Sequence, residues 1–213
     1  MKAILGLFGM LIGLLLFLGL PIGVIILLIW AFKRKSHYEA EKFTKLSIAL
    51  NGQIVPDEKG NPSYVRSVIE GIELRVWTVA EEVYSNDPND NDHGVSYYLF
   101  MDILINHGFN MTIWQESFSS RTFDKAGKAA SVKTGDPVFD NKYRITSDQP
   151  DQALAFLQVP KRKAALANLN AKGFYLFKVD SNSVQIKKPY VPMRDHVAAN
   201  LQDYTAQLCN LAL

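Results

Sequence analysis

Hydrophobic residues follow three patterns along the chain. The first is an uncharged apolar run from Ala3 to Phe32. The second, through the middle of the chain, is an alternation of apolar and polar positions that is typical of strands. The third is a spacing of three and four residues near the C-terminus, which is typical of an amphipathic helix. Together they predict a membrane-spanning helix followed by a folded domain with both strands and helices.

The apolar run is long enough to cross a membrane, because about 20 helical residues span a hydrocarbon core about 30 Å thick. It is followed by Lys33, Arg34 and Lys35, the basic flank of a retained anchor. A cleaved signal peptide is the alternative, but its apolar region would be shorter and would end at small residues. Lysine and arginine are more frequent after the run than before it. This bias favours a single-pass protein whose C-terminal domain is cytoplasmic.

Glycines gather on one face of the expected membrane helix. Gly9 and Gly13, and again Gly19 and Gly23, have the four-residue spacing that lets two membrane helices approach closely. Glycine is also simply frequent in membrane helices. Association of the anchor with itself or with a partner helix is therefore one of two interpretations of this face.

The chain divides into three expected parts, which are an anchor with its basic stop (residues 1–35), a helical stalk (36–52) and a soluble α+β domain (53–213). Asn51 and Gly52 provide the stop signal of the stalk helix. In the domain, alternation predicts strands over residues 72–77, 97–105, 111–116, 138–146, 174–179 and 184–186. His107 and Gly108 are expected to join the second and third of these strands as a hairpin, and residues 180–183 are expected to form the hairpin turn between the last two.

Three helices are expected in the domain. Asp148 is a good N-cap for the first, and Pro160 begins the second. Their inward-facing residues are expected to be Ala153, Leu154 and Leu157 in the first helix and Ala164, Leu166 and Leu169 in the second. The last helix has an apolar stripe made of Val197, Leu201, Tyr204, Leu208 and Leu211. This order predicts an α+β fold with a mainly antiparallel sheet covered on one side, for which a pleckstrin-homology-like arrangement is one candidate.

Residues that could carry out chemistry form no recognised motif. The four histidines make no metal-binding pair, and the single cysteine, Cys209, is expected to be a small buried residue of the last helix. Residues 87–94 lack the glycine and the closing glutamate of an EF-hand loop, and residues 126–131 lack the first glycine of a phosphate-binding loop. We therefore assign no catalytic residue, no metal ligand and no cofactor.

The charge balance argues against a nucleic-acid-binding protein, because 23 lysines and arginines face 21 aspartates and glutamates. Two basic clusters are candidates for contact with anionic lipid. One is the basic stop after the apolar run, and the other is Lys161, Arg162 and Lys163. A solvated helix face is the alternative for the second cluster.

One short motif resembles a known pattern. Gly135-Asp136, Phe139-Asp140 and Tyr143 match GD-x-x-FD-x-x-(F/Y), which is found in uncharacterised bacterial single-span inner-membrane proteins with a domain of unknown function. The resemblance extends over about residues 65–190. It implies a bacterial inner-membrane location and brings no reaction, cofactor or catalytic residue. The motif also has a structural explanation as a turn, a strand face and a helix cap.

Three functions remain open. The leading hypothesis is a membrane-anchored domain that binds another protein or assembles with itself. The second is a lipid- or small-ligand-binding domain at the membrane surface, using residues 161–163 and the aromatic residues Tyr97, Tyr98 and Trp114, which are expected to be exposed. The third is an enzyme with an unrecognised site in a concave pocket.

Overall fold

The computed structural model describes residues 24, 27, 28, 30, 41–60, 62–84, 93–116, 130–191 and 197–213. The chain divides into two compact units, Met1–Lys42 and Phe43–Leu213. No helix formed by the described residues is long and apolar enough to cross a membrane. The expected span lies almost entirely outside these residues, as do Gly9, Gly13, Gly19 and Gly23 and the basic stop of residues 33–35.

The described residues of the second unit form a nine-stranded sheet with the order β1-β2-β3-β4-β9-β8-β5-β7-β6, in which every neighbouring pair is antiparallel. The strands are β1 (Gln53–Pro56), β2 (Pro62–Ile69), β3 (Ile72–Tyr84), β4 (His93–Leu104), β5 (Met111–Gln115), β6 (Ala130–Val132), β7 (Tyr143–Ser147), β8 (Leu176–Asp180) and β9 (Ser183–Tyr190). The expected α+β fold with a mainly antiparallel sheet is confirmed.

Strand register places a continuous row of buried apolar side chains across the sheet. Each member lies opposite the next on the neighbouring strand, in the order Val65, Val76, Met101, Ile186, Phe177, Ile113, Ile145 and Val132. None of the eight is more than 4% exposed. Successive side chains of a strand point to opposite faces, so this row fixes which face of all these strands holds the core.

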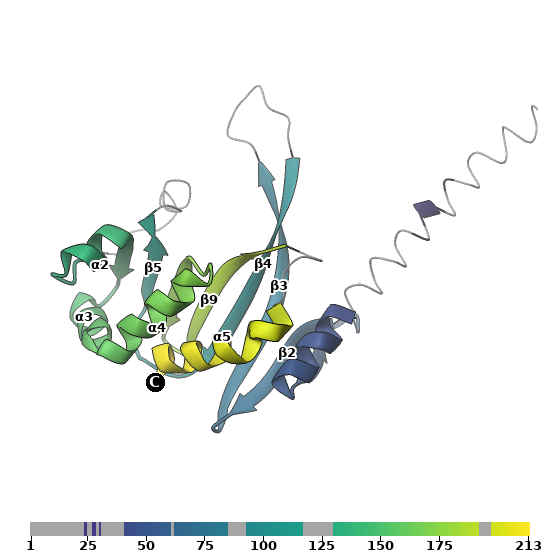
Figure 1. Ribbon diagram of the computed structural model, residues 1–213, viewed down its shortest axis with the longest axis horizontal. Helices are drawn as coiled ribbons and strands as arrows, with labels where there is room; N and C mark the ends of the chain where they lie inside the picture. The colour runs from purple at the N-terminus through teal and green to yellow at the C-terminus, as the bar shows by residue number, and fades with distance from the viewer. Residues whose placement is uncertain are drawn as a thin grey trace, which may run out of the picture. The chain divides into compact units, whose positions relative to one another are not determined.

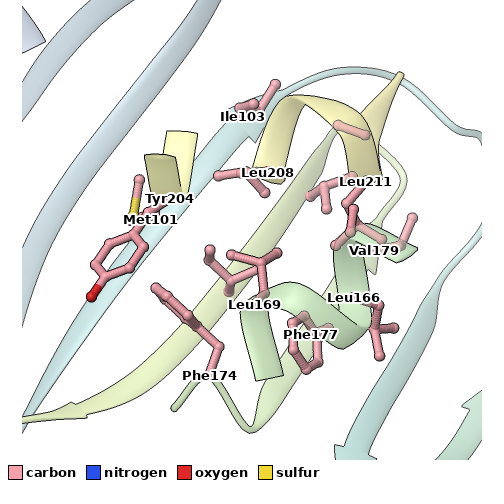
Figure 2. Packing of buried hydrophobic residues seen from close by; sticks show 14 of the residues in the cluster. Met101, Ile103, Leu166, Leu169, Phe174, Phe177, Val179, Tyr204, Leu208 and Leu211 are labelled. Atoms are coloured by element: carbon pink, nitrogen blue, oxygen red, sulfur yellow. The ribbon is translucent and has the colours of Figure 1, made fainter. Parts of the chain in front are cut away.

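Helices cover that face (Figure 1). They are residues 43–50, α2 (Pro137–Lys142), α3 (Pro150–Gln158), α4 (Pro160–Ala171) and α5 (Val197–Ala212). Figure 2 shows Leu208 and Leu211 of α5 meeting Ile103 of β4 and Val179 of β8. All five residues of the stripe expected on the last helix are buried, which confirms that element. Helices α3 and α4 also form as expected, except that Ala165 is buried in place of Ala164.

The expected hairpin between residues 97–105 and 111–116 is wrong. Strand β4 pairs with β3 and β9, whereas β5 pairs with β7 and β8. The β8–β9 hairpin, expected from its own turn residues, lies between them in the sheet. The backbone amides of Ile105 and His107 bond to the carbonyls of Asn182 and Ser181 in the turn of that hairpin, at 3.0 Å and 3.1 Å. The connection therefore crosses the end of another hairpin and does not form one.

The prediction of a strand over residues 138–146 is also wrong for its first half. Residues 137–142 form α2, because Pro137 starts a helix readily and the carboxylate of Asp136 accepts hydrogen bonds from the amides of Val138 and Phe139 at 3.1 Å and 3.2 Å. The strand begins only at Tyr143. This helix cap outweighs a weak alternation of apolar and polar residues.

The expected cap of α3 is wrong as well. Its N-cap residue is Gln149, without a side-chain bond to the helix. The carboxylate of Asp148 instead accepts bonds from the backbone amide and the side-chain amide of Asn110, at 2.8 Å and 2.7 Å. Asp148 therefore joins the start of β5 to the end of β7. With β1 and β6 at its edges and helices along one face, the sheet differs from the pleckstrin-homology-like candidate, in which a sheet curls around one helix.

Candidate functional site

The face of the sheet opposite the helices carries a row of large side chains, which we call the aromatic row. Its members lie opposite one another on neighbouring strands, in the order Trp77, Phe100, Lys187, Leu176, Trp114 and Arg144. Trp77, Phe100 and Leu176 are partly exposed. We call this side of the sheet the open face, because none of the described helices covers it.

Ring contacts order the aromatic row. Trp77 and Phe100 stack with ring centroids 5.4 Å apart and planes 6° apart. The ammonium of Lys187 lies 3.8 Å from the ring centroid of Tyr98 and 5.1 Å from that of Phe100. Tyr98 in turn contacts Tyr175 at 6.4 Å between ring centroids. Such cation–π and stacked pairs hold large side chains in fixed positions before any partner arrives.

A polar row runs beside the aromatic row, two residues along each strand. Its members are Arg75, Asp102, Gln185, Lys178, Thr112 and Thr146. The guanidinium of Arg75 donates to both oxygens of Asp102, at 2.9 Å from Nε and 2.5 Å from Nη2. A hollow of about 250 Å³ lies beside this pair. Its lining residues are Ser63, Tyr64, Arg75, Trp77, Asp102 and Gln185.

Burial raises the pKa of Asp102, and the hydrogen bonds and charge of Arg75 oppose this rise. The same bonds raise the pKa of Arg75. Only 2% of Asp102 is exposed, so its carboxylate depends on Arg75 to replace the water it has lost. The pair is therefore a fixed part of the open face.

The charges of the open face are compensated in pairs. Lys187 bonds Glu81 at 2.8 Å, and the next pairs along the sheet are Arg66 with Glu73, Lys178 with Asp180 and Arg144 with Glu116, at 2.7 to 3.0 Å. With Arg75 and Asp102 paired as well, the face presents little net charge. It is therefore not suited to a polyanion.

The two aspartates of the GD-x-x-FD motif make hydrogen bonds that hold a turn and the start of a helix. The carboxylate of Asp140 accepts hydrogen bonds from the amide and the hydroxyl of Thr134, both at 2.9 Å, and from the amide of Gly135 at 3.1 Å. Although partial burial raises the pKa of Asp140, the bonds from Thr134 and Gly135 bring it below its ordinary value. Together with the Asp136 cap, these bonds close the turn before α2.

The three basic residues of α4 are not brought together on one surface. Arg162 lies over the ring of Phe156 at 4.1 Å and donates to the backbone carbonyl of Leu213 at 3.3 Å. Lys163 lies 3.7 Å from the carboxylate of Asp136. Lys161 lines a separate pocket beside α5. Each of the three therefore has a different environment.

Of the aromatic residues expected to be exposed, Tyr97 and Tyr98 are only partly exposed and Trp114 is buried, so that expectation is wrong for Trp114. Among the described residues, no three histidine, cysteine, aspartate or glutamate side chains are placed to hold a metal ion. His107 packs edge-on against Phe156 at 5.2 Å, and burial lowers its pKa. It is a partly buried residue at the edge of the core.

The aromatic row was missed from the sequence. Trp77 and Phe100 were included in predicted strands, but nothing in the sequence gave the register that sets them opposite each other. The sequence signal that could have indicated this row is the presence of large aromatic residues, such as Trp77 and Phe100, at positions of the strands that face away from the core.

No family model matches the chain, and no curated protein matches it. Among solved structures, the chain is similar to the mycobacterial trehalose monomycolate transport factor A, with a TM-score of 0.44 and 9% sequence identity. The alignment covers 71% of this chain and 70% of that chain. Similarity at this level carries no inference about function.

Proposed function

We propose that this protein is a membrane-anchored interaction protein whose domain binds an uncharged, apolar surface of another protein through its open face. The observation that carries the proposal is the aromatic row, which runs across six strands on the face that none of the described helices covers. Aromatic residues and arginine are enriched in the cores of protein interfaces, where a few of them supply most of the binding energy.

Pairing of the charges supports a protein partner over a lipid or nucleic-acid partner. An anionic surface is attracted by unpaired lysine and arginine, whereas those of the open face already contact carboxylates. The stacked pair of Trp77 and Phe100 is held in place in the free domain, so little side-chain entropy is lost on binding. The membrane anchor follows from the apolar run of residues 3–32 and from its basic flank.

The test is purification of the tagged full-length chain in mild detergent, with mass spectrometry of co-eluting proteins and measurement of the native mass. We expect one stoichiometric partner protein. The variant Trp77→Ala should weaken the complex about thirtyfold, since truncation of a central interface tryptophan costs about 2 kcal/mol.

The matched control is Val138→Ala, which removes a large apolar side chain that is 80% exposed on α2, on the helix side. It should leave the complex intact. A complex that survives Trp77→Ala, or that Val138→Ala disrupts equally, would place the interface elsewhere and overturn the proposal. Elution of the wild-type chain as a lone monomer would overturn it as well.

A further inference from the structure

A pocket of about 500 Å³ lies on the helix side of the second unit, along α5, and is separate from the open face. This volume falls within the range of small-ligand sites, which are about 300 to 1,000 Å³. The lining residues are Ala49, Leu50, Asn51, Ile69, Glu70, Lys161, Gln202, Thr205, Ala206, Cys209, Asn210 and Leu213. They come from the end of the first helix, the β2–β3 turn, α4 and α5.

Two walls of the pocket are rigidly formed. The first helix ends in a cap in which Asn51 has φ of 48° and the amide of Gly52 bonds the carbonyl of Ser47 at 2.8 Å. The buried hydroxyl of Ser67 on β2 also donates to the carbonyl of Leu50 at 2.9 Å. The second wall is a two-residue hairpin turn, Glu70-Gly71, in which both residues have positive φ. The pocket therefore exists before a ligand binds.

Thr205 is a buried polar residue of the pocket lining. Only 5% of this residue is exposed, and its hydroxyl has no hydrogen-bond partner among the described residues. A buried hydroxyl without a partner is unfavourable, and a ligand whose hydroxyl or carbonyl oxygen reached this atom through the pocket wall would satisfy it. This hydroxyl is the observation that points to a ligand with polar groups and not to a purely apolar one.

The charges around the pocket cancel. Lys161 and Glu70 both line it, and both act on the nearby thiol of Cys209, whose pKa is raised first by burial and then by Glu70, while Lys161 opposes the rise. An anionic headgroup would be attracted by Lys161 but repelled by Glu70. The remaining polar lining is uncharged, namely Asn51, Gln202, Thr205 and Asn210. Amides both donate and accept hydrogen bonds, so they suit a neutral, hydroxylated group.

We infer that this pocket binds a neutral single-chain amphiphile, of which a monoacylglycerol is the simplest example. Its hydroxylated head bonds Thr205 and the neighbouring amides, and its chain lies against the apolar lining. That lining consists of Ala49, Leu50, Ile69, Ala206, Cys209 and Leu213. Removal of its methylene groups from water is favourable, so the chain supplies most of the affinity and the head supplies the selectivity.

Cys209 provides the measurement, because it is the only cysteine of the chain and is partly exposed in the pocket wall. The rate of thiol labelling by a maleimide is measured on the full-length chain in phosphatidylcholine nanodiscs. Added 1-monolauroylglycerol should slow labelling at least about tenfold, and lauric acid at equal concentration should slow it clearly less. Thr205→Val should raise the concentration needed for protection about tenfold, as expected for one lost hydrogen bond, whereas Thr205→Ser should not.

The matched control for effects on the bilayer is the double variant Cys209→Ser/Ala199→Cys. It moves the thiol to an exposed position of α5 that is not part of the pocket lining. Its labelling rate should not respond to 1-monolauroylglycerol. The inference is overturned if the wild-type rate is unchanged by the probe, if lauric acid protects as well, if Thr205→Val is protected like wild type, or if the control thiol is protected equally.

Discussion

The ion pair of Arg75 and Asp102 makes an asymmetric prediction about stability. The two residues are buried to different degrees, with 3% of the Asp102 side chain and 33% of the Arg75 side chain exposed. Removal of Arg75 leaves a carboxylate that is largely shielded from water and has lost its charged partner. Removal of the charge of Asp102 leaves a guanidinium that water can partly solvate. We therefore expect Arg75→Met to destabilise the protein more than Asp102→Asn at neutral pH.

The expected magnitudes follow from the burial of each partner. Breaking a fully buried pair costs about 3–5 kcal/mol. We expect about 3 kcal/mol for Arg75→Met, and about 1–2 kcal/mol for Asp102→Asn because the remaining Arg75 is one-third exposed and keeps an amide oxygen as acceptor.

The pH dependence separates the two variants. In Arg75→Met, burial raises the pKa of Asp102 further above its unfolded value, because the opposing bonds of Arg75 are gone. An acid with a raised pKa in the folded state binds its proton more tightly when folded. The defect is therefore complete above the raised pKa and shrinks as the pH falls toward the unfolded value, about 3.9. The Asp102→Asn defect changes in the opposite sense, because the pKa of Asp102 is raised in the folded wild type as well, so the wild type gains stability over the amide variant as the pH falls.

Urea unfolding of the full-length chain, followed by tryptophan fluorescence at a series of pH values, measures both defects. Equal defects at neutral pH would show that the carboxylate does not depend on Arg75. A defect of Arg75→Met that stays constant down to acidic pH would show that Asp102 carries no charge in the folded protein. Either result would refute the reasoning.

Two further predictions concern the second unit. Gly52→Ala should lower the free energy of unfolding by about 1–3 kcal/mol, since a Cβ there would lie 2.6 Å from the carbonyl oxygen of Arg66. The control is Gly94→Ala, because a Cβ at Gly94 would have no atom within 4 Å, and it should leave the urea midpoint unchanged. Asp140→Asn should destabilise by about 1 kcal/mol at neutral pH. The pKa of Asp140 is lowered in the folded protein, so this stabilisation is present above the unfolded-state pKa and is lost as the pH falls through the folded-state pKa. Equal stability of wild type and variant at neutral pH would contradict the role of the Asp140 hydrogen bonds.

Local signals predicted much of the domain. The stripe of α5 and the turn between β8 and β9 could be identified because each depends on residues close together in the sequence. The stop of the first helix was also correct, as the positive φ of Asn51 shows. These elements need only helical spacing, alternation and turn-forming residues.

Elements that depend on distant partners were not predictable. Strand β4 looked like half of a hairpin with β5 because the two strands are close in sequence, but its partner on that side is β9. The pair of Arg75 and Asp102 depends on the register of β3 and β4, which no spacing within either strand reveals. The pocket depends on four segments that meet only in the folded chain. Periodicity tells which residues face inward and not which strand lies beside which.

The order of the strands has a consequence for how the protein is made. Strands β4 and β5 are synthesised before the β8–β9 hairpin that lies between them in the sheet. Tyr97 of β4, for example, has no partner on that side until Tyr190 of β9 has been synthesised. During translation the two parts of the sheet cannot join, and each exposes an unpaired edge that is able to pair with another chain. A ribosome stalled between these strands would thus hold two incomplete sheets, and release of the final hairpin would be the event that unites them.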